Sequence, residues 1–315
     1  MVTRRDILKT TALAGAASML PMNLLHAFEA DSIITRAIPK TGEKLPIVGL
    51  GSSATFRSLA QREDISALTD VITTLVDNHC TVLDTAPSYG ASEEVSGKIA
   101  RATKTTDKIF WATKVNAAGR GRGKADPSAV QRQLERSFKY LGTSPIDLIQ
   151  VHNLADLPTQ MSAIQELKED QRVRYIGTTV TRTNRYPDLE KAMKDYPVDF
   201  IGVDYSVENR VAANSVLPLA KELGIAVLIY VPFGRARLFG RVKGVDVPEF
   251  AQEIGCDTWG KFFIKYVAAH PAVTCVTPAT SKAKHMLDNT GAAYGELPDG
   301  PTLKKMEQFI DALPN

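Results

Sequence analysis

The sequence predicts an α/β fold in which eight parallel strands, each followed by a helix, close into a (β/α)8 TIM barrel, with a hairpin before the barrel and a helix after it. Almost entirely apolar segments alternate with amphipathic segments of helical spacing. Parallel strands buried on both faces must be apolar in this way, and 315 residues suit one such barrel. An open doubly wound sheet usually has a glycine-rich turn after its first strand, and Gly49-Leu50-Gly51 lacks the third glycine of that turn.

The expected elements follow in chain order. Residues 32–38 and 45–51 should form a hairpin that leads into the first strand. Residues 128–142 should form a helix capped by Ser128 and ended by Gly142. The other expected strands are residues 81–84, 108–115, 146–153, 173–180, 199–206, 226–233 and 272–279. The other expected helices are residues 64–80, 92–102, 157–170, 186–196, 212–224 and 258–270, with a closing helix from about Lys284.

Composition points to a small-molecule ligand. The chain is 44% hydrophobic and 23% charged with a formal charge of +3, and no cluster of basic and aromatic residues predicts nucleic-acid binding. Cys80, Cys256 and Cys275 are widely spaced and odd in number, which fits neither a disulfide framework nor a metal site. We expect them to be small buried hydrophobic residues.

Residues 1–30 have the features of a twin-arginine-type export signal. Arg4 and Arg5 stand side by side, and the apolar run after them is too short to span a bilayer. We therefore expect residues 31–315 to form a single barrel domain that the twin-arginine machinery exports, to the periplasm or beyond, without a stable membrane anchor. That route carries folded proteins and often serves those that acquire a cofactor first. An ordinary amphipathic N-terminal helix is the alternative.

Four ionisable residues occupy the ends of successive predicted strands. Asp84 ends the second strand, Lys114 the third and His152 the fourth, while Tyr89 lies in the loop after Asp84. The chemistry of such barrels is built at the carboxyl ends of the strands. Each residue alone has a structural explanation, such as a helix cap or a surface ring. Four different chemical types at equivalent positions favour a catalytic site.

These four side chains suit acid and base chemistry. A phenol has an ordinary pKa of about 10, and a neighbouring ammonium lowers that pKa. We expect Lys114 to act on Tyr89 in this way, with Asp84 supplying the charge that keeps the lysine ionised. His152 can then hydrogen-bond a substrate oxygen and orient it toward the tyrosine.

Four motifs occur in a characteristic order and spacing. They are LDTAPSYG with Asp84 and Tyr89, ATKV with Lys114, YLGTSPIDLIQVH ending in His152, and TPATSKAKHMLDN at residues 277–289. Together they resemble the aldo-keto reductase superfamily over about residues 47–291. The resemblance implies a barrel enzyme in which a reduced nicotinamide delivers hydride to an aldehyde or ketone carbon and the tyrosine protonates the oxygen.

The resemblance also implies where the dinucleotide binds. Residues 277–289 correspond to the segment that holds the adenosine phosphate end, although Thr280 and Ser281 could instead cap the last helix. Tyr230 matches the aromatic residue that stacks on the nicotinamide in many relatives. Lys282 favours NADP(H) over NAD(H). The residues expected to bind the cofactor are Gly51, Thr178, Thr179, Tyr230, Pro232, Gly234, Arg235, Thr280, Ser281, Lys282, His285 and Asn289.

Two positions depart from the family pattern. The family usually has Ser-Asn where this chain has Thr179 and Val180, and glutamine where it has Gly202, and these residues hold the nicotinamide carboxamide. Loss of each hydrogen bond would cost on the order of 1 kcal/mol. Two alternatives therefore stay open beside the reductase: a barrel that retains its dinucleotide for internal redox on a sugar-like substrate, and a dinucleotide-binding sensor without turnover. The substrate is not specified by the sequence.

Overall fold

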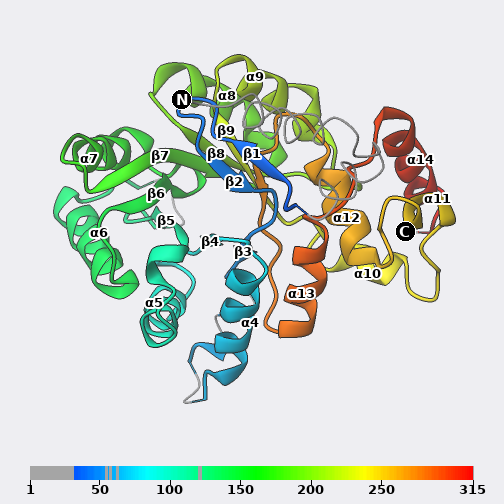
Figure 1. Ribbon diagram of the computed structural model, residues 1–315. Helices are drawn as coiled ribbons and strands as arrows, with labels where there is room; N and C mark the ends of the chain where they lie inside the picture. Colours follow the sequence, from blue (N-terminus) through cyan, green and yellow to red (C-terminus); the bar gives the residue numbers. More distant parts are fainter. Residues whose placement is uncertain (1–31, 54–55, 57–58, 62–63, 120–122, 315) are drawn as a thin grey trace, which may run out of the picture.

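The computed structural model describes residues 32–53, 56, 59–61, 64–119 and 123–314, so the predicted export signal lies outside the described residues. An eight-stranded parallel sheet surrounded by helices forms its centre (Figure 1). The strands lie side by side in chain order. Their bounds are β3 (Leu50–Gly51), β4 (Val82–Asp84), β5 (Phe110–Val115), β6 (Ile146–Val151), β7 (Val173–Val180), β8 (Phe200–Asp204), β9 (Ala226–Tyr230) and β10 (Cys275–Val276).

The sheet closes on itself between its first and last strands. The backbone N–H of Gly49 donates to the carbonyl of Val276 at 2.8 Å, and that of Val276 donates to Ile47 at 2.8 Å. A parallel bridge between Gly51 and Ala279 continues the closure toward the carboxyl ends. A closed ring of parallel strands leaves no sheet edge exposed. The predicted (β/α)8 barrel is confirmed.

Helices connect the strands and cover the outside of the barrel (Figure 1). Two of them, α10 and α11, lie in the long connection after β9. The helices are α4 (Ser66–Asp77), α5 (Ser92–Ala102), α6 (Pro127–Leu141), α7 (Leu157–Glu169), α8 (Tyr186–Asp195), α9 (Val216–Glu222), α10 (Arg237–Arg241), α11 (Glu249–Gln252), α12 (Trp259–Ala268), α13 (Ala283–Gly291) and α14 (Gly300–Asp311). Short 3-10 helices cover Thr106–Lys108, His152–Leu154, Thr183–Arg185 and Val211–Asn214.

The start of α6 differs from the prediction. Asp126, rather than Ser128, caps the helix, because its carboxylate accepts the backbone N–H of Ser128 at 3.1 Å. Pro127 fills the first helical position, where a missing N–H costs nothing. The predicted end at Gly142 is confirmed: this residue has a φ of 72° and donates to the carbonyl of Phe138.

The C-terminal region also holds more than the single closing helix expected. After α13 the chain turns and forms α14, which Asp299 caps by accepting the N–H of Thr302 at 2.9 Å. Met306 and Ile310 on α14 are buried, and the helix lies beside α11 (Figure 1). The second helix thus completes the cover over the long connection after β9.

The predicted hairpin consists of β1 (Thr35–Ala37) and β2 (Lys44–Pro46), paired antiparallel. It closes the amino-terminal end of the barrel. At this end Tyr175 of β7 donates from its hydroxyl to Glu43 at 2.6 Å and lies 2.9 Å from the hydroxyl of Thr41. The inner core here is Ile38, Leu45, Val82, Phe110, Ala112, Leu148, Tyr175, Phe200, Ala226, Leu228 and Cys275. The inner core and the hairpin thus fill this end of the barrel.

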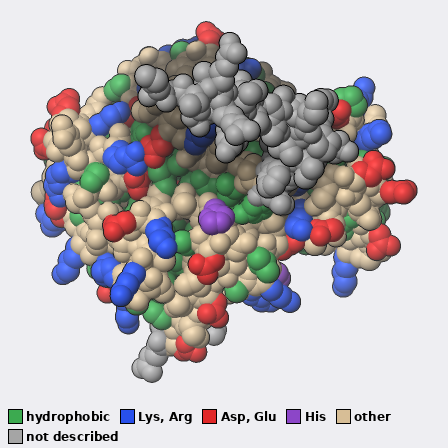
Figure 2. All heavy atoms as spheres, in the orientation of Figure 1, with side chains coloured by type: hydrophobic (Ala, Val, Ile, Leu, Met, Phe, Trp, Pro, Cys, Tyr) green, Lys and Arg blue, Asp and Glu red, His purple; other side chains and the backbone are tan. Residues whose placement is uncertain are grey.

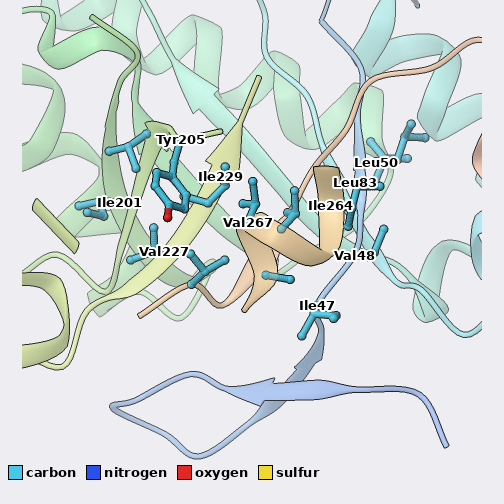
Figure 3. Close-up of a cluster of buried hydrophobic side chains, with 14 of the residues drawn as sticks. Ile47, Val48, Leu50, Leu83, Ile201, Tyr205, Val227, Ile229, Ile264 and Val267 are labelled. Atoms are coloured by element: carbon cyan, nitrogen blue, oxygen red, sulfur yellow. The ribbon is translucent and has the colours of Figure 1, made fainter. Parts of the chain in front are cut away.

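A second apolar layer lies between the strands and the helices. Figure 3 shows part of it, with Ile47, Val48, Leu50, Leu83, Ile201, Tyr205, Val227 and Ile229 from the strand segments and Ile264 and Val267 from α12. All three cysteines are buried and free, as predicted. Basic and acidic side chains are interspersed on the face shown in Figure 2. None of the described helices combines the length and hydrophobicity needed to span a bilayer.

Candidate active site

A cleft of about 1590 Å³ lies at the carboxyl ends of the strands. It exceeds the ~300–1,000 Å³ of an ordinary small-molecule pocket, so it has room for an extended ligand and a second, smaller one. Every residue proposed from the sequence as catalytic or cofactor-binding lines this cleft, with the exception of Thr178 and Gly234. The barrel therefore brings together residues that are far apart in the sequence, from Gly51 to Asn289.

A buried ion pair forms the floor of the cleft. The ammonium of Lys114 lies 2.7 Å from both carboxylate oxygens of Asp84 and donates a further hydrogen bond to the carbonyl of Thr85 at 2.8 Å. Lys114 and Asp84 are 1% and 3% exposed. Burial alone would lower the pKa of Lys114, but Asp84 and Tyr89 outweigh it and raise that pKa. The lysine therefore stays charged inside the barrel.

Tyr89 lies directly above this pair. The Lys114 ammonium is 5.1 Å from the centre of the Tyr89 ring. Lys114 lowers the pKa of Tyr89, as we expected, but the net shift of that pKa is upward. Burial of the phenol raises its pKa, Asp84 adds to the rise, and the opposing effects of Lys114 and Arg235 are smaller. Tyr89 is therefore protonated at neutral pH, the state that a proton donor requires.

His152 faces the same space from the next strand. It follows the last residue of β6, and its ring meets the Tyr89 ring edge-on with 5.8 Å between centroids. Its Nδ1 lies 3.4 Å from the hydroxyl of Ser88, a residue that the sequence analysis did not single out. This contact orients the imidazole beside the phenol. A substrate oxygen bound here would meet both groups.

The predicted phosphate-binding loop borders the far part of the cleft. Thr280 accepts the backbone N–H of Lys282 at 3.2 Å, which shapes the turn before α13. Lys282 is itself the residue before that helix, and no side chain caps the helix, so Thr280 and Ser281 do not have the capping role considered as the alternative. Lys282 and His285 are exposed at the cleft. In the described part of the chain, Lys282 forms no ion pair.

Asn289 has a buried amide at this end of the cleft, which shows whether a dinucleotide would fit there. The residue is 3% exposed, and its amide nitrogen has no hydrogen-bond partner among the residues that the structure describes. A buried amide left unpaired costs about 1–3 kcal/mol. A ligand with acceptor atoms, such as an adenine ring, would pair it. Asn289 therefore fits the adenosine end of the dinucleotide that the sequence led us to expect.

The loop after β9 reaches over the cleft in a tightly turned conformation. Val231, Gly234 and Arg235 have φ values of 58°, 56° and 57°. Arg235 and Pro232 line the cleft, and the Arg235 side chain is exposed there. Gly234 points elsewhere, since a Cβ on it would lie 2.8 Å from the carboxylate of Glu208. Gly234 thus sets the course of the loop without lining the cleft.

The threonines of β7 divide between two faces of the strand. Thr178 is fully buried and donates its hydroxyl to the carbonyl of Val151 at 3.0 Å, so it supports the barrel wall. Thr179 lines the cleft, and its hydroxyl accepts the backbone N–H of Asn153 at 3.1 Å. Val180 also lines the cleft. Of the two threonines, only Thr179 is placed to contact a ligand.

A second tyrosine reaches into the floor of the cleft. Tyr230 at the end of β9 donates from its hydroxyl to Asp84 at 3.0 Å and accepts a hydrogen bond from Gln150 at 2.9 Å. Its ring centre is 5.1 Å from the Lys114 ammonium. Gln150 was not predicted from the sequence. Its register with Lys114, the residue that pairs with it on β5, is the signal that could have identified it.

A model of the Aldo/keto reductase family matches residues 48–302. The chain belongs to this family. Aldo-keto reductase str7 from Strobilurus tenacellus is 29% identical to it, over 68% of this chain and 72% of that protein. Aldo-keto reductase yakc from Schizosaccharomyces pombe, whose name specifies NADP(+), is 26% identical over 89% of this chain and 92% of that protein.

Solved structures share the fold of this aldo/keto reductase. An aldo-keto reductase from Klebsiella pneumoniae in complex with NADPH has a TM-score of 0.70 at 21% identity, covering 89% of this chain and 95% of that one. The holo form of aldo-keto reductase AKR11C1 from Bacillus halodurans has a TM-score of 0.69 at 21% identity, covering 89% and 96%. These likenesses support the barrel architecture.

The ion pair leads to a stability prediction for this aldo/keto reductase. Lys114→Met leaves the Asp84 carboxylate buried and unpaired, which we expect to lower the free energy of unfolding by about 3–5 kcal/mol. The double variant Asp84→Asn, Lys114→Met removes both charges and should recover more than half of that loss. Urea unfolding of the three proteins measures these values. A Lys114→Met variant as stable as the wild type would contradict the buried pair.

Proposed function

We propose that the protein reduces an aldehyde or ketone with a reduced nicotinamide dinucleotide and that Tyr89 supplies the proton. The bound cofactor would supply the hydride. The observation that carries the proposal is the Asp84–Lys114 pair beneath Tyr89, with His152 against the same phenol. A buried and complete acid–base set of this kind favours turnover over binding alone.

Each of the four side chains has its own role in proton transfer to the substrate oxygen. Tyr89 is protonated and donates to the oxygen as negative charge develops on it. The Lys114 ammonium stabilises the phenolate that remains, and Asp84 holds the ammonium in place. His152 positions the oxygen against the phenol. Each group is fixed by neighbours before substrate arrives, so little reorganisation is needed during proton transfer.

We further propose that NADP(H) is used in preference to NAD(H). Relatives support this preference, since yakc is named for NADP(+) and the Klebsiella pneumoniae structure contains NADPH. Lys282 supports it independently, as an exposed cation at the cleft that none of the described acidic side chains neutralises. A phosphate on the adenosine ribose would pair with such a cation. His285 contributes less charge, because burial and the nearby Lys282 lower its pKa.

Removal of the Tyr89 hydroxyl tests the proton donor. Tyr89→Phe should lower kcat for carbonyl reduction by about 10²–10⁴-fold, the usual contribution of a general acid, with the cofactor Kd unchanged. Steady-state kinetics on a panel of aldehydes, ketones and oxidised sugars, with fluorescence titration of NADPH, measure both. Tyr140→Phe, on α6 and away from the cleft, is the control. Equal activity of Tyr89→Phe and wild type would rule out this role.

The raised pKa of Tyr89 also predicts a pH profile. Reduction requires the protonated phenol, and protonation is complete well below a pKa above the ordinary value of about 10. We therefore expect kcat for reduction to show no limb from Tyr89 between about pH 6 and 9, and to fall only in more alkaline solution. A limb near neutral pH that disappears in Tyr89→Phe would contradict the sign of this shift.

Lys282→Met tests the cofactor preference. Loss of a charge-assisted hydrogen bond to phosphate should raise the Kd of NADPH about tenfold and change that of NADH less than about twofold. Lys284→Met provides the matched control, since Lys284 is an exposed lysine two residues later that does not line the cleft. An equal effect of Lys282→Met on both dinucleotides would count against a phosphate contact.

We also propose that the protein is exported by the twin-arginine route. The support is the pair Arg4 and Arg5 followed by a short apolar run. Residues 1–30 fused to a reporter that functions only after export should deliver it across the membrane of a bacterium that has this machinery. Replacement of both arginines by lysine should block delivery. A reporter that stays inside with the intact signal would contradict the proposal.

A further inference from the structure

Tyr230 occupies a position between the buried ion pair and Gln150 that ring stacking alone does not explain. Its hydroxyl lies 3.0 Å from Oδ1 of Asp84 and 2.9 Å from Nε2 of Gln150. Its ring lies next to the Lys114 ammonium, at the same 5.1 Å as the ring of Tyr89. The hydroxyl of Tyr230, on β9, thus joins the Asp84 carboxylate on β4 to Gln150 on β6.

The donors and acceptors allow one arrangement of the hydrogen bonds between Gln150, Tyr230 and Asp84. An ionised carboxylate only accepts, so the single hydroxyl proton of Tyr230 must point to Asp84. The phenol oxygen then accepts, and the amide nitrogen of Gln150 must be the group that donates to it. The Gln150 side chain with its amide reversed would leave two acceptors facing each other. The order of donation is therefore Gln150 to Tyr230 to Asp84.

Gly202 makes this position of the ring accessible. A Cβ on Gly202 would lie 2.2 Å from Cε2 of Tyr230, 2.7 Å from Cζ and 2.8 Å from the hydroxyl. β8 and β9 are neighbouring strands, and Gly202 is paired with Leu228. The ring of Tyr230 therefore lies across the bare backbone of the adjacent strand. A side chain at residue 202 would collide with the ring in this position.

We propose that Tyr230 is a positioning residue for proton transfer, which holds the Asp84 carboxylate, and through it the Lys114 ammonium, in place beneath Tyr89. Gln150 fixes the Tyr230 hydroxyl, and Gly202 admits its ring. This role rests on the proposed reductase function and adds to it a residue that acts through the ion pair. It depends on the hydroxyl, whereas a role in stacking would depend on the ring alone.

Tyr230→Phe separates the two roles, because it keeps the ring and removes the hydroxyl. We expect kcat for reduction of para-nitrobenzaldehyde with NADPH to fall about tenfold, the effect of one lost hydrogen bond to a charged group. KM and the Kd of NADPH should stay within about twofold of wild type. Tyr175→Phe is the matched control, since its hydroxyl lies at the closed end of the same barrel. It should leave all three values unchanged.

The ionisation of Tyr89 gives a second readout that does not need turnover. The Tyr230 hydroxyl offsets part of the Asp84 charge, which opposes formation of a Tyr89 phenolate. Its removal should shift phenolate formation to higher pH. Tyrosinate absorbance measures this shift, with the Tyr89→Phe protein subtracted to isolate that residue. Oxidation of para-nitrobenzyl alcohol, which requires the phenolate, should show the same displacement of its alkaline limb.

Two further variants test the proposed series of hydrogen bonds from Gln150 through Tyr230 to Asp84. Gly202→Ala should displace the ring and reproduce both the lower kcat and the shift. Gln150→Leu combined with Tyr230→Phe should be no worse than the worse single variant, because the residues act as one unit. An unchanged kcat and unchanged Tyr89 ionisation in Tyr230→Phe would overturn the inference, as would a change in KM or cofactor Kd alone. A wild-type protein without carbonyl reduction would contradict the proposed function, while the absorbance titration would still decide the role of Tyr230.

Discussion

The buried pair between Lys114 and Asp84 is the interaction on which the site depends. A lysine with 1% exposure would lose its proton without a counter-charge, and both carboxylate oxygens stand within 2.7 Å of it. Such a pair is expensive to bury. Fixed donors and acceptors around the pair offset the free energy lost on its desolvation, among them the carbonyl of Thr85 and the hydroxyl of Tyr230.

One end of the barrel holds the apolar core that stabilises the fold, and the other end holds the reactive groups. The hairpin and the inner apolar core close the amino-terminal end around Tyr175, Phe110 and Phe200. The acid–base groups and the loops proposed to bind the dinucleotide lie at the other end, where the strands stop and the connections begin. The loops can therefore vary with substrate while the core below them holds the strand ends at fixed separations.

The sequence predicted those features that depend on periodicity and on strand order. Alternating apolar and amphipathic segments specify the barrel, and the strand ends place Asp84, Lys114 and His152 together. What it did not predict depends on three-dimensional surroundings. The sign of the shift in the pKa of Tyr89 reflects a balance of burial against charge. The cap at Asp126 required a choice between two adequate neighbouring residues.

Tyr230 and Gln150 illustrate the same limit, since nothing local shows that the hydroxyl of one and the amide of the other meet across the barrel. Gly202 read in isolation suggests a lost ligand contact, whereas in the fold its empty position is filled by a ring from the next strand. Residues 202 and 230 thus share one volume. A side chain can be added at residue 202 only after residue 230 has been reoriented or made smaller. Packing therefore constrains the order in which substitutions at these two positions can arise.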